Sequence, residues 1–284
     1  VDAIPVRLGE LSKETQFALD YFGVKPQKLI ETVKTQISDL DFDSINPISP
    51  QTSLKTAWAI IRKNSVKTLP VVDDDDKLVG IASQSNITSS YMDIWDSNVI
   101  QKSGTTLDNI LDTLAAKCVY SSKENREFKG KVIVAAMQPE SITEVIEEGD
   151  IVLCGDRADA QNVILDSGAS LMILTGNHEV SDEIIDKAKK LNCTVIVSPY
   201  DTFTAARLIP QSIPISYVMK KDNIISFKTY DFIDDVREVM LDTRYRSYPV
   251  VNEENKIIGS ISRYHLISKN KKKVMLVDHN EKSQ

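Results

Sequence analysis

The chain has 284 residues, 42% of them hydrophobic, and a formal net charge of −7 at pH 7. This length predicts two or three compact units. The negative charge argues against nucleic acid as the main partner, because a phosphate backbone needs a basic surface. No apolar run is long enough to span a bilayer, so we expect no membrane partner. The few cysteines, Cys118, Cys154 and Cys193, lack metal-ligand spacing and predict buried thiols in a reducing cytoplasm.

The first forty residues predict a short strand at 3–7, a helix at 13–22 and a second helical stretch near 28–37. Ser12 is a suitable N-cap residue, the apolar side chains of residues 13–22 form a stripe, and Gly23 follows the helix. The sequence starts within this pattern and stops soon after another one begins. We therefore expect it to be part of a longer protein.

An internal repeat organises the rest of the chain. Residues 66–87 and 245–266 match without a gap at an offset of 179 positions, and both contain Pro-Val-Val, an acidic turn, Lys, an aliphatic pair before Gly, and Ser. Each copy predicts a β-hairpin. One strand–helix–hairpin–helix unit cannot bury its sheet alone, so we expect the two to pack together. The apolar positions of the helix before each hairpin are Leu54, Ala57 and Ile61 in the first copy and Ile233, Val236 and Met240 in the second.

Between the copies, four apolar, β-branched segments alternate with helical patterns. Such segments are typical of buried parallel strands. Their alternation with helices predicts an α/β layer with loops at the strand ends. The segments are residues 132–136, 151–154, 171–174 and 194–197, and two of the loops are Gly155-Asp156-Arg157 and Thr175-Gly176-Asn177.

The repeat resembles the CBS domain, and two copies resemble the CBS pair that is called a Bateman module. The central unit resembles the DRTGG domain, from which it departs at Ala158 and Asn177. The resemblance implies the α/β class: an α+β CBS pair with an inserted α/β DRTGG-like domain. The expected ranges are 41–102 for the first CBS domain, 103–213 for the DRTGG-like domain and 214–273 for the second CBS domain.

Both ends of the chain resemble parts of one catalytic domain. Leu276-Val277-Asp278-His279-Asn280-Glu281 is similar to the metal-site segment of family II inorganic pyrophosphatases, which are DHH phosphoesterases, and residues 3–17 are similar to another part of that domain. A subset of the family carries a CBS–DRTGG–CBS insert. The resemblance therefore implies stubs of a DHH domain at 1–40 and 274–284, with the parent's catalytic DHH domain as partner.

The implied parent is a manganese- or cobalt-dependent hydrolase in which Asp278 binds metal. The family's other His and Asp ligands are absent here, since the three histidines are His178, His265 and His279. We therefore expect no bound Mn²⁺ or Co²⁺, no catalytic residue and no hydrolysis by this chain alone.

The segment Arg244-Tyr245-Arg246-Ser247-Tyr248 is the first candidate for nucleotide binding. Two guanidinium groups can hold a phosphate by bidentate hydrogen bonds, and a tyrosine ring can stack on a base. Lys67-Thr68 is the counterpart in the first copy. The alternative is a solvated loop whose arginines pair with nearby acids.

The second candidate is the end of each hairpin, Ser83-Gln84-Ser85-Asn86 and Ser262–His265, because hydroxyls and amides at a helix start suit a phosphate or a ribose. Plain N-capping is the alternative. The CBS resemblance implies that the position of Asn86 and His265 contacts ribose, and that the backbones of Ile48 and Ile225 frame adenine. The predicted nucleotide-binding residues are Ile48, Lys67, Thr68, Ser83, Gln84, Ser85, Asn86, Lys220, Ile225, Arg244, Tyr245, Arg246, Ser247 and His265.

The sequence and the resemblance together predict an adenine-nucleotide sensor whose ligand lies in the cleft between the CBS domains. The family implies inhibition by AMP and ADP, activation by ATP or diadenosine polyphosphates, and a homodimer formed through the CBS pair. Three alternatives remain open: a module for another adenosyl ligand such as S-adenosylmethionine, a CBS pair that only dimerises, and an enzyme in the α/β insert. The insert lacks a Gly-rich Lys-Ser/Thr phosphate loop and a nucleophile–base pair, which disfavours the last.

Overall fold

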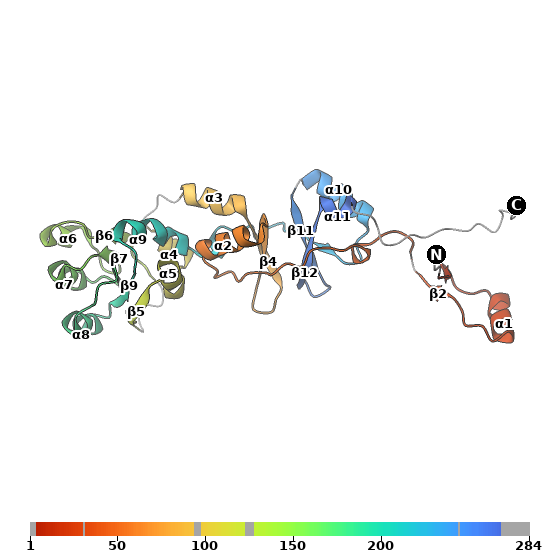
Figure 1. Ribbon diagram of the computed structural model, residues 1–284, viewed down its shortest axis with the longest axis horizontal. Coiled ribbons are helices and arrows are strands. Elements are labelled where there is room, and N and C mark those ends of the chain that lie inside the picture. Colours follow the sequence, from red (N-terminus) through yellow and green to blue (C-terminus); the bar gives the residue numbers. More distant parts are fainter. Residues whose placement is uncertain (1–3, 31, 94–97, 123–127, 244, 268–284) are drawn as a thin grey trace. The chain divides into compact units, whose positions relative to one another are not determined.

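The computed structural model describes residues 4–30, 32–93, 98–122, 128–243 and 245–267, and Figure 1 shows their ribbon. The chain has the predicted α/β character and divides into two compact units. The first unit consists of residues 1–43, 227–250 and 260–284, and the second of residues 44–226 and 251–259. Each unit combines segments that lie far apart in the sequence. The domain ranges expected from the sequence are continuous, and they stay a prediction.

The N-terminal part of the first unit contains a parallel pair of short strands and one helix. Strand β1 (Val6–Arg7) pairs with β2 (Lys28–Leu29), and α1 (Lys13–Tyr21) lies between them in the sequence. The helical stretch predicted near 28–37 is wrong, because its first two residues pair with β1 as a strand. The Ser12 hydroxyl accepts a hydrogen bond from the Thr15 amide at 3.1 Å, which confirms the predicted N-cap. No side chain of α1 is buried.

The first CBS repeat lies in the second unit and has the predicted helix and hairpin. Its two strands pair antiparallel, with Thr68 opposite Ser83 and Val71 opposite Gly80. A Cβ on Gly80 would meet the side chain of Met219, which packs against this strand position. The elements are α2 (Leu54–Asn64), which buries Leu54, Ala57 and Ile61 as predicted, β3 (Thr68–Val72), β4 (Leu78–Ser83) and α3 (Gln84–Asp93).

The second CBS repeat contributes a three-stranded sheet in the order β10-β11-β12. Its helix buries the three predicted apolar positions, Ile233, Val236 and Met240. Both predicted helix stripes are therefore confirmed, because each places its apolar side chains on one face at helical spacing. The elements are β10 (Phe227–Lys228), α10 (Ile233–Thr243), β11 (Ser247–Val251), β12 (Ile257–Ser262) and α11 (Arg263–Ile267).

The segment before each repeat pairs with the hairpin of the other repeat, which explains why the units interleave. In the second unit, the Lys220 amide donates to the Ile81 carbonyl at 2.9 Å, and the Ile81 amide donates back at 3.0 Å. In the first unit, the Ser260 amide donates to the Asp43 carbonyl at 2.8 Å. The turn of the second hairpin also belongs to the second unit, where the Leu78 amide donates to the Asn255 carbonyl at 3.0 Å.

The DRTGG-like region forms a five-stranded sheet in the order β5-β9-β8-β7-β6. The strands β6 to β9 are parallel and confirm the four predicted apolar segments, whereas β5 pairs antiparallel with β9. The strands are β5 (Lys117–Tyr120), β6 (Val132–Val134), β7 (Ile151–Cys154), β8 (Leu171–Leu174) and β9 (Thr194–Val197). The helices that accompany this sheet are α4 (Val99–Ser103), α5 (Leu107–Leu114), α6 (Pro139–Val145), α7 (Ala158–Asp166), α8 (Asp182–Lys190) and α9 (Thr202–Leu208), followed by the 3₁₀ turn η2 (Ile209–Ser212). Two further 3₁₀ turns, η1 (Ile37–Asp39) and η3 (Ile215–Tyr217), lie before the first and the second repeat.

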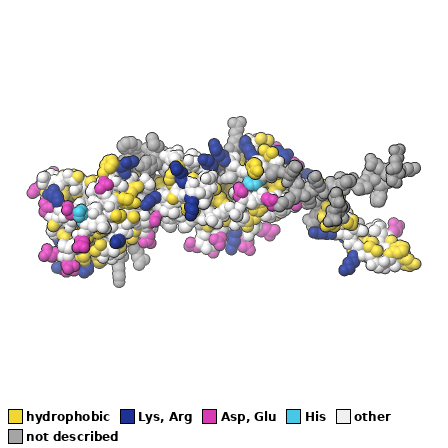
Figure 2. Space-filling model, viewed as in Figure 1, with side chains coloured by type: hydrophobic (Ala, Val, Ile, Leu, Met, Phe, Trp, Pro, Cys, Tyr) yellow, Lys and Arg dark blue, Asp and Glu magenta, His cyan; other side chains and the backbone are white. Residues whose placement is uncertain are grey.

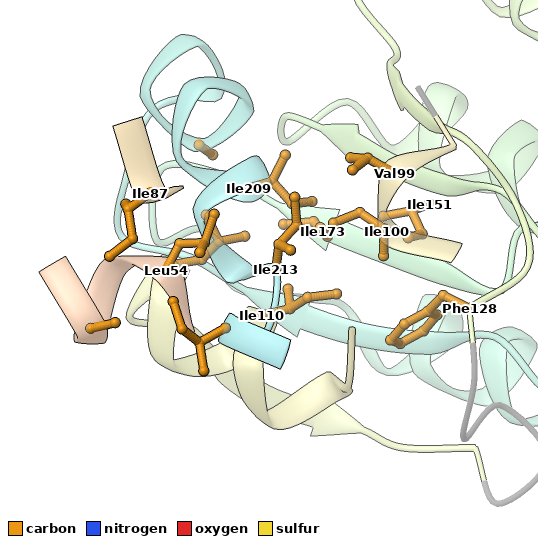
Figure 3. Packing of buried hydrophobic residues seen from close by; sticks show 14 of the residues in the cluster. Leu54, Ile87, Val99, Ile100, Ile110, Phe128, Ile151, Ile173, Ile209 and Ile213 are labelled. Carbon is orange, nitrogen blue, oxygen red and sulfur yellow. The ribbon is translucent and has the colours of Figure 1, made fainter. Parts of the chain in front are cut away.

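One continuous apolar core joins this sheet to the first CBS repeat. Leu54 of α2, Ile110 of α5 and Ile213 belong to the same buried cluster as Ile151 and Ile173, which lie on one face of the sheet (Figure 3). The other face of the sheet packs against α6, α7 and α8 in a second cluster. The first repeat and the DRTGG-like region therefore share the second unit as one folded body.

Polar contacts reinforce this shared core. The Lys55 ammonium of α2 donates to the Thr113 carbonyl at 2.7 Å, where a cation suits the negative end of the α5 dipole. The Thr56 hydroxyl donates to Asp112 at 2.9 Å, and the Asn109 side-chain amide donates to the Gln51 carbonyl at 2.7 Å. These bonds connect residues of the first CBS repeat to α5.

Burial of the cysteines differs from the prediction at one position. Cys154 and Cys193 are buried, but Cys118 lies exposed on β5, because that strand forms one edge of the sheet. Acidic and basic side chains both occur on the face that Figure 2 shows. None of the helices in the described ranges has an apolar stretch of the length that a membrane crossing needs.

Candidate nucleotide-binding site

The fold brings the predicted residues of the first repeat together at one end of its hairpin. Thr68 and Ser83 are opposite each other in the ladder, and the Gln84 amide donates to the Lys67 carbonyl at 3.0 Å. The exposed Lys67 ammonium lies 3.4 Å from the side-chain oxygen of Gln84. The Lys67 cation therefore lies beside the start of α3.

Ser83 and Asn86 form a reciprocal capping box at the start of α3. The Ser83 hydroxyl accepts the Asn86 amide at 3.1 Å, and the Asn86 side-chain oxygen accepts the Ser83 amide at 3.1 Å and also the Ser83 hydroxyl. The Ser85 hydroxyl lies 3.0 Å from that of Ser83. The N-capping alternative therefore applies here. A carbonyl oxygen has two acceptor positions, so in this conformation Asn86 would meet a ribose through its side-chain N–H groups.

The second repeat builds the same turn with a different side chain. The Ser262 amide donates to Nδ1 of His265 at 3.0 Å, and the Ser262 hydroxyl lies 2.9 Å from the same nitrogen. A nitrogen that accepts an amide proton carries none itself, so the network assigns the hydrogen of the neutral ring to Nε2. Nε2 lies 3.5 Å from the Asp43 carboxylate. His265 is buried, and it replaces Asn86 as the acceptor of the capping box.

The aromatic and basic segment of the second repeat is open to solvent. Tyr245 is 42% exposed, and Arg246 is exposed as well, whereas Ser247 is half-buried at the start of β11. The Tyr245 ring lies 5.7 Å from the ring of Tyr248, which is completely buried. Arg244 lies outside the described residues. The described part of this segment thus offers a cation and an aromatic face to a ligand.

Arg263 is a residue that the sequence prediction left out, and its contact distinguishes the two repeats. Its guanidinium donates to the Met240 carbonyl at 2.6 Å, near the C-terminal end of α10. At the matching position, Gln84 of the first repeat instead accepts from Lys67. The guanidinium of Arg263 is therefore used at the end of α10. In the sequence, Arg263 differs from its counterpart because it is a cation where the first copy carries the side-chain amide of Gln84.

Ile48, Ile225 and Lys220 have different surroundings. The Ile48 amide donates to the Pro70 carbonyl at 3.0 Å and its carbonyl accepts the Val72 amide at 3.0 Å, so its N–H is already used. Ile225 is half-buried and precedes β10, and Phe227 stands at the position that matches Ile48. The backbone of Lys220 pairs with Ile81 of β4 in the first repeat. The roles predicted for these residues toward adenine and phosphate stay predictions.

The backbone N–H groups of Gly176 and Asn177, in the DRTGG-like loop Thr175-Gly176-Asn177, are bonded to the segment after β9. The Gly176 amide donates to the Tyr200 carbonyl at 2.7 Å and the Asn177 amide to the Ser198 carbonyl at 2.9 Å. In the other loop, the Arg157 guanidinium binds Asp159 at 2.8 Å, and this hydrogen bond lowers the pKa of the Asp159 carboxyl. Backbone N–H groups that are already bonded cannot cradle an anion.

A metal site was predicted for the parent enzyme only, at Asp278. That residue lies outside the described residues. In the ranges that the structure covers, no group of three or more His, Cys, Asp or Glu side chains is placed to hold a metal ion. These residues therefore do not fit Mn²⁺ or Co²⁺, and no chemistry of such an ion is assigned to them.

Comparisons with known proteins define the class. The CBS domain family matches residues 37–93 and 215–271, and the DRTGG domain family matches residues 109–212. The cobalt-dependent inorganic pyrophosphatase of Clostridium perfringens is 55% identical over 99% of this chain and 51% of its own length. The probable manganese-dependent inorganic pyrophosphatase of Thermotoga maritima is 32% identical over 99% of this chain and 51% of its own length. The chain thus spans about half the length of these two relatives.

A solved structure covers most of the fold. It contains the CBS and DRTGG domains of the regulatory region of Clostridium perfringens pyrophosphatase complexed with its activator, diadenosine tetraphosphate. It is 52% identical, superposes with a TM-score of 0.78, and corresponds to 81% of this chain and 100% of that one. The chain belongs to the CBS–DRTGG regulatory regions of inorganic pyrophosphatases.

Proposed function

We propose that this chain is the adenine-nucleotide-sensing regulatory region of a manganese- or cobalt-dependent inorganic pyrophosphatase. The observation that carries the proposal is the likeness to the Clostridium perfringens regulatory region, whose complex contains the activator diadenosine tetraphosphate and whose whole length is matched at 52% identity. Activation by ATP or diadenosine polyphosphates and inhibition by AMP and ADP are the regulatory responses we propose. The region acts in the cytoplasm and does not hydrolyse pyrophosphate by itself.

The contacts of the two repeats support different roles in binding. The exposed Arg246 guanidinium offers planar, bidentate donors to a phosphate, and the partly exposed Tyr245 ring offers a stacking face to a base. In the first repeat, Lys67 supplies a single point charge beside hydroxyl and amide groups. We assign phosphate recognition mainly to the second repeat and ribose recognition mainly to the first.

Regulation by such a region depends on differential binding. A nucleotide shifts the enzyme only by the difference between its affinities for the two arrangements of the protein, typically about 1–3 kcal/mol. We propose a homodimer through the CBS pair. A diadenosine polyphosphate then engages sites of both subunits, and the second contact gains from a high effective concentration.

Calorimetric titration of the full chain with AMP and with diadenosine tetraphosphate tests the proposal. Arg246→Ala removes charged hydrogen bonds worth about 1.5–3 kcal/mol, so affinity falls roughly tenfold to a hundredfold. Arg237→Ala is the matched control, because Arg237 is also an exposed arginine of the second repeat but pairs with Asp234 at 3.3 Å. Heat with S-adenosylmethionine and none with either nucleotide would overturn the proposal, as would an absence of heat with all three.

A further inference from the structure

We propose that Tyr248 is a positioning residue for nucleotide binding: its buried hydroxyl holds the backbone of the Tyr245–Arg246 segment in the conformation that meets the ligand. The inference rests on the proposed function. Tyr248 is 1% exposed, so it does not touch a ligand itself. Its ring is fixed between Phe227, at 5.3 Å, and Tyr245, at 5.7 Å between ring centroids.

The hydroxyl of Tyr248 closes a chain of hydrogen bonds from α10 to the binding segment. The Tyr245 amide donates to the hydroxyl oxygen at 3.0 Å. The Thr243 hydroxyl lies 2.7 Å from the same oxygen and also donates to the Val239 carbonyl at 2.7 Å. Because the single Thr243 hydrogen is used on that carbonyl, Tyr248 is the donor to Thr243. The direction therefore runs from the Tyr245 amide through Tyr248 and Thr243 to the backbone of α10.

This chain of bonds ties the residue directly before Arg246 to the end of α10. Thr243 is the last residue of α10, and Tyr245 precedes Arg246 and the strand. Because a buried hydroxyl holds the Tyr245 amide, the backbone conformations open to Tyr245 are limited. The guanidinium of Arg246 and the ring of Tyr245 are thus presented from a restrained backbone, and binding does not have to order it.

The described residues of the first repeat form no equivalent hydroxyl clamp. At the offset of 179 positions, Leu69 stands where the second repeat has Tyr248, and Asn64 stands where it has Thr243. The first connection instead turns through Ser65, whose φ of 54° is left-handed and whose amide donates to the Arg62 carbonyl. The hydroxyl clamp therefore occurs in the repeat that carries the aromatic and cationic segment.

Tyr248→Phe in the full chain tests the inference, because it removes the hydroxyl and keeps the ring. We expect the affinity for AMP and for diadenosine tetraphosphate to fall about tenfold, about 1.4 kcal/mol, which is the size of one lost hydrogen bond. We also expect faster hydrogen exchange at the Tyr245 amide, since that amide loses its acceptor. Thr243→Val should weaken binding in the same direction, and Thr243→Ser, which keeps the hydroxyl, should restore wild-type affinity.

Three results would overturn the inference. Wild-type affinity in Tyr248→Phe together with faster exchange at the Tyr245 amide would show that the clamp does not control binding. A lowered melting temperature with unchanged dissociation constants would assign the hydroxyl a purely structural role. Equal losses in Thr243→Ser and Thr243→Val would exclude the hydroxyl relay. A wild-type chain that binds no nucleotide is a separate outcome, because it contradicts the proposed function before any variant is compared.

Discussion

The two CBS repeats have the same fold and the same turn geometry, yet their side chains differ at the positions that can meet a ligand. Both close their hairpin with a serine whose amide donates to a side chain three residues later, Asn86 in one repeat and His265 in the other. They differ before the Pro-Val-Val strand, where Lys67 stands in one copy and Arg246 in the other. Positions that hold the backbone thus keep their geometry in both copies, while exposed positions have diverged in chemistry.

The repeats also differ in what they are joined to. The first repeat shares its core with the DRTGG-like sheet, as Figure 3 shows for Leu54, Ile110 and Ile173. Most of the second repeat belongs to the other compact unit. The first repeat and the DRTGG-like region therefore form one folded body.

The largest expected effect is the loss of stability that follows when a substitution disrupts the shared core. Ile173→Ala on β8 should destabilise the second unit by about 2–5 kcal/mol, because it leaves a cavity in a completely buried place. If the core is continuous, the loss also appears in the unfolding of the first repeat, which Trp58 reports by fluorescence in a Trp95→Phe background.

Val236→Ala is the control for this comparison, since Val236 is equally buried but lies in the other unit. It should leave the Trp58 transition in urea nearly unchanged. If Ile173→Ala leaves the urea midpoint of the Trp58 fluorescence unchanged, the first repeat and the DRTGG-like sheet unfold separately.

The turns that end the two hairpins should respond alike. Ser83→Ala and Ser262→Ala each remove a hydroxyl that bonds the side chain three residues later, and each should cost about 0.5–1.5 kcal/mol in urea unfolding. Asn86→His and His265→Asn exchange one acceptor for the other, so each should cost clearly less than the alanine variant of the same turn. An exchange as costly as Ser→Ala would show that the two turns are not equivalent.

A smaller effect concerns the buried thiols of the DRTGG-like sheet, which have no counterpart in the repeats. Burial raises the pKa of Cys154 and of Cys193 to about 12. Above pH 9 the unfolded thiols ionise while the folded ones stay protonated, so the unfolded state releases protons and stability falls as pH rises from about 9 toward about 12. Denaturant midpoints between pH 8 and pH 11 measure this slope, and Cys154→Ala should reduce it.

Cys118 gives the matching chemical test. Cys118 is exposed as a residue, and the partial desolvation of its thiol, together with nearby Asp108, raises the pKa of that thiol. In the folded chain a thiol reagent should therefore modify Cys118 alone, and all three cysteines should react only after unfolding. Modification of Cys154 or Cys193 in the native protein would contradict the burial of the sheet.

Periodicity in the sequence was sufficient to predict the parts of the fold that bury one face. The stripes of α2 and α10 and the apolar strands of the central sheet follow from helical and strand spacing. Strand β5 was missed because its residues are mostly exposed and form no apolar run. Residues 36–43 and 213–220 pair with the opposite repeat, and no local pattern encodes such a tertiary choice.

The candidate site was predictable as residue types but not as hydrogen bonds. Arg246 and Tyr245 were predicted from the sequence because a guanidinium can hold a phosphate by bidentate hydrogen bonds and a tyrosine ring can stack on a base. The use of the Asn86 acceptor in a cap, and of the Tyr248 hydroxyl as a clamp, depends on geometry that composition does not contain. A position-by-position comparison of the copies would have singled out Tyr248, because Leu69 occupies the matching position in the first copy.

The division of labour between the repeats is tested most directly by the preference for AMP over adenosine. Calorimetric titration of the wild-type chain, Lys67→Ala and Arg246→Ala with both ligands gives the ratio of the two dissociation constants for each protein. Arg246→Ala should reduce the preference for AMP by about tenfold or more, because it removes bidentate phosphate contacts, while Lys67→Ala should reduce it by about threefold or less. Equal losses in the two variants, or an unchanged preference in Arg246→Ala, would contradict an asymmetric site.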